Sequence, residues 1–121
     1  MSSQIQIEKL GKNNYDTWVI QMEALAIKNG NFGYIDNSIP CPKPITLNDT
    51  NGAAVEKRNE ERYAWVQASL KAKSDIILSI KPSELTHTKG CKYANRVWAK
   101  LFYLNLFNNF NRRSHTPRFL P

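Results

Sequence analysis

The fold is decided by residues 53–80, which read AAVEKRNEERYAWVQASLKAKSDIILSI. This stretch contains neither Gly nor Pro and is rich in Glu, Lys, Arg, Ala and Leu, residues that lose little side-chain freedom in a helix. It therefore predicts one long helix that ends before Pro82. Two apolar stripes lie side by side along it, so its second half is expected to be buried over a wide face. The first stripe is Tyr63, Val66, Leu70 and Ile77, and the second is Trp65, Ala68, Ala72 and Ile76.

Two further helices flank this one. Upstream, apolar residues recur at three-to-four spacing from residue 15, Asn13 or Asn14 can cap the start, and Gly30 follows the end. Before this helix, residues 1–12 alternate loosely in hydropathy, which predicts a short strand or an extended arm. Downstream, after Gly90, a last amphipathic helix is predicted from the spacing of Ala94, Val97, Trp98 and Leu101.

The connection between the first two helices, residues 30–52, is predicted to be a loop. It is rich in Asn, Asp and Ser, and its prolines fix the backbone and remove amide donors. We expect its early part, with Phe32, Tyr34 and Ile35, to pack back on the first helix. The later part, with Pro40, Pro42 and Pro44, is expected to be exposed.

These elements predict an all-α domain of three main helices over residues 1–101. Large aromatic residues at helical spacing belong to protein cores far more often than to ligand sites, so Trp18, Trp65 and Trp98 are expected to meet in one cluster. Residues 102–121 contain many aromatic residues close to several Asn residues. This segment is expected to form a poorly ordered tail. The predicted core is Tyr15, Trp18, Met22, Leu25, Trp65, Leu70, Ile77, Val97, Trp98 and Leu101.

The composition suits one soluble domain, because 41% of the 121 residues are hydrophobic and 22% are charged. The net charge of +7 favours acidic partners, nucleic acid before all others. The basic residues are spread along the chain, however, and Arg112, Arg113 and Arg118 all lie in the tail. A solvated helix face is therefore favoured over a binding patch for Lys57, Arg58 and Arg62.

Cysteine usage predicts no metal centre. Cys41 and Cys91 cannot supply a zinc site alone, because such sites use four Cys or His ligands at tight spacing. With no secretory signal at the start, we expect free thiols and an intracellular, cytoplasmic location. The longest apolar runs are far shorter than a bilayer requires, so no membrane insertion is expected.

The sequence offers little for catalysis, and no cofactor or small-molecule substrate is predicted. It contains no phosphate-binding loop and no nucleophile in a known pattern with a base. Cys91 and His87 are close in sequence, but such a pair needs spatial alignment and a third, orienting group. A partly buried thiol beside a surface histidine is the favoured interpretation, and an enzyme is the weakest of three functional hypotheses.

An ordered set of short motifs carries a family resemblance. Lys9-Leu10-Gly11 is followed by Asn14-Tyr15, by a helix with Trp18, and by Phe32-Gly33-Tyr34-Ile35. Further on come Trp65, Lys71 to Leu78, Lys89 to Lys92, and Val97-Trp98. In this order, over residues 7–101, the motifs resemble the first part of the gag polypeptide of copia-type LTR retrotransposons. After Leu101 the sequence departs from that family.

The resemblance implies a non-enzymatic, capsid-type polypeptide that is helical, associates with itself through helix faces and helps to package the RNA of the element. The zinc knuckle, protease, integrase and reverse transcriptase of such elements have no counterpart here, so their activities are not expected. The alternative hypothesis is a small basic helical module that binds RNA or DNA weakly and without specificity. It predicts affinity that falls steeply with salt.

Overall fold

The computed structural model describes residues 6–45 and 52–115, with side chains described as far as residue 110. Within these residues the elements are all helices: α1 (Tyr15–Lys28), α2 (Phe32–Ile35), α3 (Gly52–Leu78), the 3-10 helix η1 (Pro82–Thr88) and α4 (Ala94–His115). The all-α prediction is confirmed. The long helix expected from residues 53–80 is α3, and the two flanking helices are α1 and α4.

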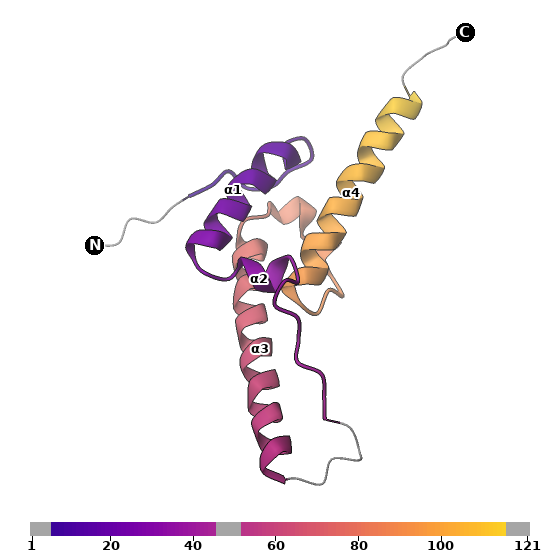
Figure 1. Ribbon diagram of the computed structural model, residues 1–121. Helices are drawn as coiled ribbons and strands as arrows, with labels where there is room; N and C mark the ends of the chain where they lie inside the picture. The colour runs from indigo at the N-terminus through magenta and orange to yellow at the C-terminus, as the bar shows by residue number, and fades with distance from the viewer. Residues whose placement is uncertain (1–5, 46–51, 116–121) are drawn as a thin grey trace.

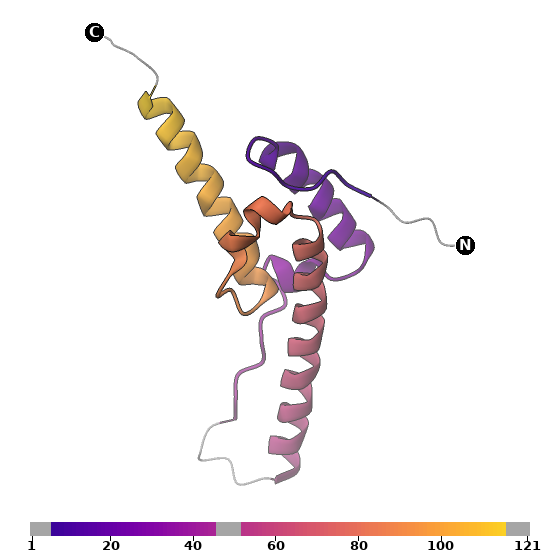
Figure 2. The ribbon, with the colours of Figure 1, turned by 180° about the vertical axis from the view of Figure 1, so that it is seen from behind.

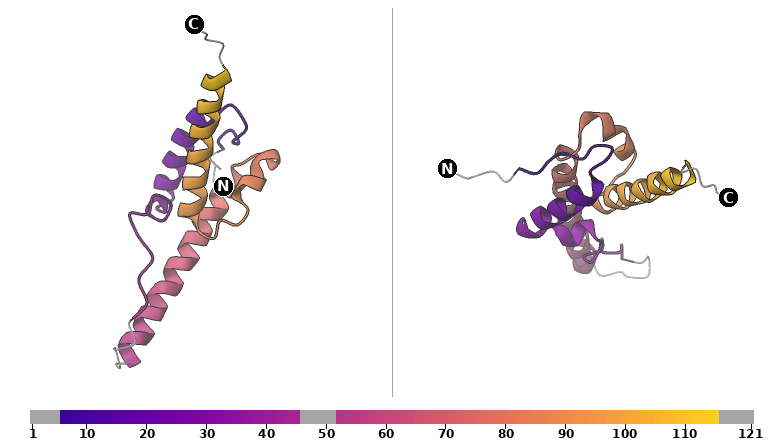
Figure 3. Two further views of the ribbon diagram at one scale, coloured as in Figure 1. Left: turned by 90° about the vertical axis from the view of Figure 1, so that its right-hand side faces the viewer. Right: turned by 90° about the horizontal axis from the view of Figure 1, so that it is seen from above.

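Helix α3 is the longest element, and the other helices gather around its C-terminal end (Figure 1). The short α2 lies among α1, α3 and α4 and contacts all three, and η1 packs against α4. The view from behind shows α1 and η1 together at this end of α3 (Figure 2). The first half of α3 and the last half of α4 project away from the centre in different directions (Figure 3).

The core forms where α1, α3 and α4 meet. Met22, Ile76 and Val97 are fully buried there, one from each helix, and Ile35 of α2 closes the cluster. The indole rings of Trp18 and Trp98 lie 5.8 Å apart between centroids, and the edge of Phe32 meets Trp98 at 5.9 Å. The early part of the connection, expected to be loop, is the short helix α2 in the structure. It contacts α1, as the sequence predicted, and it also packs against α3 and α4.

The described part of the N-terminal arm, residues 6–12, is fixed to the end of α3, and residues 1–5 lie outside the described part. Leu10 forms an isolated parallel β-bridge with Ile80. Its amide donates to the carbonyl of Ser79 at 2.8 Å, and its own carbonyl accepts from the amide of Lys81 at 2.9 Å. The buried Trp18 indole N–H donates to the same Ser79 carbonyl at 2.9 Å. The arm, α1 and the end of α3 thus share one polar junction.

The helix ends correct one prediction about capping. Asn14 occupies the N-cap position of α1, but its side chain makes no cap hydrogen bond. Its Oδ1 accepts from the Gly11 amide and its Nδ2 donates to the Lys9 carbonyl, so it braces the arm instead. Gly30 does end α1, with φ at +75°, a conformation that costs glycine little.

The predicted single cluster of three tryptophans is wrong for Trp65. This residue is buried, but its ring packs against Tyr93 at 5.1 Å and Tyr34 at 6.3 Å. Its indole N–H donates to the Ile39 carbonyl. The reason is the length of α3. The Trp18 indole donates to the Ser79 carbonyl at the end of α3. Trp65 lies about 20 Å before Ser79 along the helix, at 1.5 Å per residue.

The predicted core is also wrong for Leu70, which is 39% exposed. The buried stripe of α3 is instead Trp65, Ser69, Ala72 and Ile76. Of the other predicted core residues, Trp18, Met22, Val97 and Leu101 are buried, while the rest are half-buried. Among the half-buried ones, Ile77 lies outside the main cluster, and the remaining three pack against it: Tyr15, Leu25 and Trp98.

The segment after Leu101 was expected to be poorly ordered, but it continues α4 without a break as far as His115. Its aromatic residues and Asn are compatible with a helix because it contains no Gly or Pro before Pro117. Residues 116–121 lie outside the described part. The last helix therefore has two halves, one packed on the core and one carrying a separate surface.

Candidate functional site

The second half of α4 carries the largest group of exposed apolar side chains on any described helix. We call it the α4 stripe, and its members are between 45% and 66% exposed. At 100° per residue, they fall within a single sector of roughly 140° around the helix. Monomeric proteins rarely leave so continuous an apolar face in water. The α4 stripe consists of Phe102, Tyr103, Leu106, Phe107 and Phe110.

The opposite side of the same helix faces the body of the molecule. Leu101 is buried in the core, and Leu104, Asn105 and Asn108 line a groove beside it. These four positions occupy the sector that the α4 stripe leaves free, because they are offset from it by one or two residues in a 3.6-residue repeat. The α4 stripe is therefore directed away from the packed interior.

The α4 stripe carries no charge. The sequence from Leu101 to Asn111 has no acidic or basic residue, with Lys100 before it and Arg112 after it. Within residues 101–111, Asn is the only polar residue type, and the Tyr103 hydroxyl is the only other polar side-chain group. A partner that met this surface would remove apolar area from water without having to strip hydration from an ion.

A smaller apolar face lies on α1. Ile20 is 70% exposed and Ile27 is 60% exposed. They are seven residues apart, two turns, and so share one side of the helix. Trp18, Met22 and Ala26 form the buried side of α1. The α1 pair and the α4 stripe belong to different helices, and neither is part of the core cluster.

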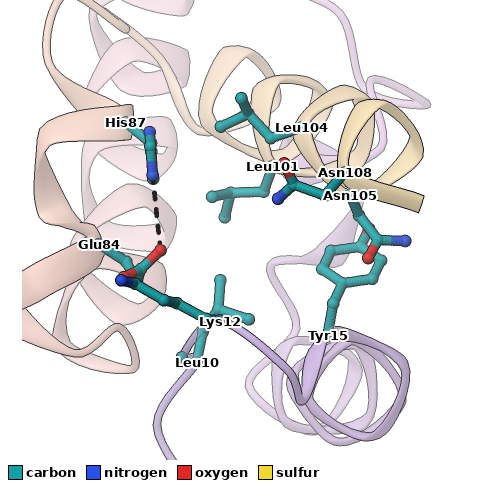
Figure 4. A pocket seen from close by; sticks show the side chains of 10 residues that line it. Leu10, Lys12, Tyr15, Glu84, His87, Leu101, Leu104, Asn105 and Asn108 are labelled. Atoms are coloured by element: carbon teal, nitrogen blue, oxygen red, sulfur yellow. Dashed lines mark ion pairs between the residues drawn. The ribbon is translucent and has the colours of Figure 1, made fainter. Parts of the chain in front are cut away.

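The groove beside α4 is shown in Figure 4, where the arm, η1 and α4 meet around Leu10, Leu101 and Leu104. Its open volume is about 60 Å³. Small-molecule sites usually enclose about 300–1,000 Å³. The groove is therefore a poor match for a cofactor or a metabolite.

Two ionisable side chains on η1 border this groove. His87 Nε2 lies 3.5 Å from Glu84 Oε1, and the Glu84 Oε2 accepts from the Ser83 hydroxyl at 3.0 Å (Figure 4). Glu84 is largely buried and His87 half-buried. The imidazole is thus engaged with a carboxylate of its own 3-10 helix.

Cys91, the other half of the only candidate catalytic pair, lies in a different setting. It is half-buried and packs against the hydrophobic core, and its amide donates to the Thr88 carbonyl at 3.1 Å. The His87 imidazole contacts the Glu84 carboxylate. The structure supplies no orienting contact from His87 to Cys91 among the described residues.

Tyr15 also lines the groove. Burial raises the pKa of its phenol above 10.0, and the negative charge of the adjacent Asp16 raises it further. Its ring also packs against Trp18 at 6.1 Å. The phenol is therefore protonated at neutral pH, and Tyr15 is a neutral member of the groove wall.

Three basic side chains of the described residues contact other parts of the chain. That of Lys81 lies against Gly11 in the arm. On α3, Arg58 and Arg62 instead donate to the carbonyls of Lys43 and Pro42, which secures the Pro-rich segment beside that helix. These two guanidinium groups therefore have partners within the chain.

The described residues contain neither a candidate metal site nor a candidate membrane span. Among the side chains that the structure describes, no group of three His, Cys, Asp or Glu residues comes together as a metal site would require. None of the helices in the described ranges is both long and apolar enough to cross a bilayer.

The sequence did not predict the α4 stripe as a site, because its residues were assigned to a poorly ordered tail. A usable signal was present. Phe102, Leu106 and Phe110 recur every four residues, and Tyr103 with Phe107 repeat that spacing one position later. This is the pattern of one apolar helix face.

Comparison of the chain with protein-family models, with curated proteins and with solved structures found no match in any of the three. The residues and their geometry are therefore the basis for assigning a function.

Proposed function

We propose that this chain is a structural module that assembles with copies of itself, of the capsid-forming gag type, and that it acts without catalysis. The observation that carries the proposal is the exposed, uncharged α4 stripe. The ordered motifs over residues 7–101, which resemble copia-type gag, agree with such a role.

The second exposed face, on α1, adds support from symmetry. A single self-complementary face produces a closed dimer and nothing larger, whereas a shell or a lattice requires at least two independent contacts per copy. Ile20 and Ile27 on α1 provide a candidate for the second contact. Weak contacts repeated through symmetry are sufficient for a capsid, so neither face has to be large.

The test is the mass of the full chain in solution, measured by size-exclusion chromatography with light scattering over a wide concentration range. We expect the mass to rise above the 13.9 kDa of one copy as concentration increases. Electron microscopy of the concentrated sample should show whether closed particles form. A constant monomer mass up to millimolar concentration, without particles, would count decisively against the proposal.

Salt and nuclease treatment separate this proposal from nucleic-acid binding, for which the net charge of +7 is the motive. Apolar association should persist after nuclease digestion and at high ionic strength, because salt screens charges but not apolar contacts. Complexes held by RNA should dissociate under both treatments. A chain that is monomeric alone and binds RNA with a steep salt dependence would favour the basic module instead.

A further inference from the structure

We propose that a second copy of this chain docks on the α4 stripe, with the two α4 helices antiparallel and Leu106 at the twofold axis. This inference rests on the proposed function, since it specifies the partner and the geometry of one assembly contact. It concerns residues 102–110, where the sequence no longer resembles gag.

The position of the α4 stripe leaves room for a whole partner helix. The second half of α4 projects beyond the rest of the molecule (Figures 1 and 3). The α4 stripe lies on the side of that half opposite the groove residues Leu101, Leu104, Asn105 and Asn108. An incoming helix can therefore approach along the full length of the α4 stripe without displacing any part of the core.

The spacing of the α4 stripe is symmetric about its centre. Phe102 and Phe110 each lie four residues from Leu106 and form one ridge on the helix surface. Such four-residue ridges are the ones that interdigitate in the commonest class of helix packing. In an antiparallel pair centred on Leu106, Phe102 meets the partner's Phe110, and the same contact occurs twice. A self-complementary face of this kind suits an isologous dimer.

Electrostatics favours the antiparallel arrangement. With no charged side chain from Leu101 to Asn111, the helix dipoles are the main electrostatic term across the contact. Dipoles attract when the helices run in opposite directions and repel when they run in the same direction. An acidic or basic partner, by contrast, would find no opposite charge on this face.

The area is sufficient for a weak, specific dimer. A fully exposed aromatic side chain offers about 200 Å², so the four rings at 45–66% exposure present roughly 450 Å² in each copy. Two copies would bury roughly 900 Å² through the rings alone, close to the ~1,000 Å² that a specific interface needs, with Leu106 still to be added.

Cysteine cross-linking tests the geometry. The full chain with Cys41→Ser and Cys91→Ala serves as background, with its helical content checked by circular dichroism. Into it we introduce Leu106→Cys, Phe102→Cys or Phe110→Cys, one at a time. In the proposed pair the two copies of residue 106 face each other, whereas the two copies of residue 102 are about 12 Å apart along the axis. A disulfide tolerates only about 4.5 Å between Cβ atoms.

We expect Leu106→Cys to form a covalent dimer under mild oxidation at least about tenfold faster than Phe102→Cys or Phe110→Cys alone. A mixture of the last two variants should cross-link as a heterodimer. Equally fast homodimers at residues 102, 106 and 110 would indicate parallel helices and overturn the arrangement.

A charge substitution tests the same face without new cysteines. Phe107→Asp places a carboxylate on the α4 stripe, and Asn108→Asp places the same charge one residue later on the groove side. Phe107→Asp should weaken self-association by about 10–100-fold in dissociation constant, because both copies would bury a charge. Asn108→Asp should change it by less than about threefold. Equal effects of the two variants would refute the docking surface.

The two proposals can fail separately. Assembly that survives Phe107→Asp, with no cross-link at residue 106, would overturn the α4 pairing and leave the assembly function in place. A chain that stays monomeric at every concentration would remove both. Monomer that binds phosphatidylcholine vesicles, and loses that binding in Phe107→Asp, would assign the α4 stripe to lipid and overturn the pairing.

Discussion

The Trp18→Phe substitution probes the junction on which the core depends. Trp18 is 1% exposed, and its indole N–H donates to the Ser79 carbonyl, which also accepts from the Leu10 amide. Phenylalanine keeps an aromatic ring against Trp98 but removes that donor. The variant therefore isolates the link between α1 and the end of α3 while leaving most of the packing in place.

The expected loss has two parts. A net hydrogen bond contributes about 1 kcal/mol. The smaller ring leaves roughly 35 Å³ unfilled, which at about 24 cal/mol per Å³ costs roughly 0.8 kcal/mol, with the lost transfer of the missing atoms in addition. We expect the free energy of unfolding to fall by about 2–3 kcal/mol, a large share of the 5–15 kcal/mol typical of a domain.

The assay is urea denaturation followed by far-ultraviolet circular dichroism, at a protein concentration low enough that self-association contributes nothing. Trp98→Phe is the control, since Trp98 is only half-buried, and its loss should be about 1 kcal/mol. A Trp18→Phe variant within about 0.5 kcal/mol of the natural chain would show that the Ser79 junction contributes little and would refute the reasoning.

Three further changes test other contacts. Ser69→Ala should lower the free energy of unfolding by about 1–2 kcal/mol in the same urea assay, because the buried Ala94 amide at the start of α4 would lose its acceptor, whereas the exposed Ser74→Ala should be nearly neutral. Gly33→Ala should cost about 1 kcal/mol, since the added methyl would come within 2.5 Å of Ile39 Cδ1; an unchanged urea midpoint would mean that Ile39 moves aside freely. Because the pKa of the Tyr15 phenol is raised in the folded state, the folded chain keeps a proton that the unfolded chain releases near pH 10. The contribution of Tyr15 to the free energy of unfolding is therefore complete below that pH and is lost as pH rises through the raised value. Tyr15→Phe should lack this component when urea midpoints of the two proteins are compared from neutral to alkaline pH, and parallel curves would contradict the assignment.

Local sequence signals were sufficient for α1, α3 and the first half of α4. The absence of Gly and Pro over residues 53–80 predicted α3, and the apolar spacing from Tyr15 predicted α1, with Gly30 correctly placed at its end. The pattern could not decide which side of α3 is buried, because both of its stripes have helical spacing. Leu70 belongs to the exposed stripe. The buried stripe includes Ser69, whose hydroxyl accepts from the Ala94 amide at the start of α4.

Long-range placement was the harder part. Trp65 has the same helical setting as Trp18 and Trp98, but its distance along α3 separates it from them, and only the relative positions of whole helices reveal this. The α4 stripe was missed for a different reason. Its residues were judged by composition, as a crowd of aromatics and Asn, while their four-residue repeat carried the structural information.

The Ser79 carbonyl also sets an order of events during synthesis. Trp18 and its acceptor are 61 residues apart, and translation adds about 5–20 residues per second. For roughly 3–12 s after Trp18 is made, its indole therefore lacks the Ser79 acceptor, and α1 cannot yet pack on the end of α3. The junction that joins the arm, α1 and α3 is therefore completed only after the long helix has been made.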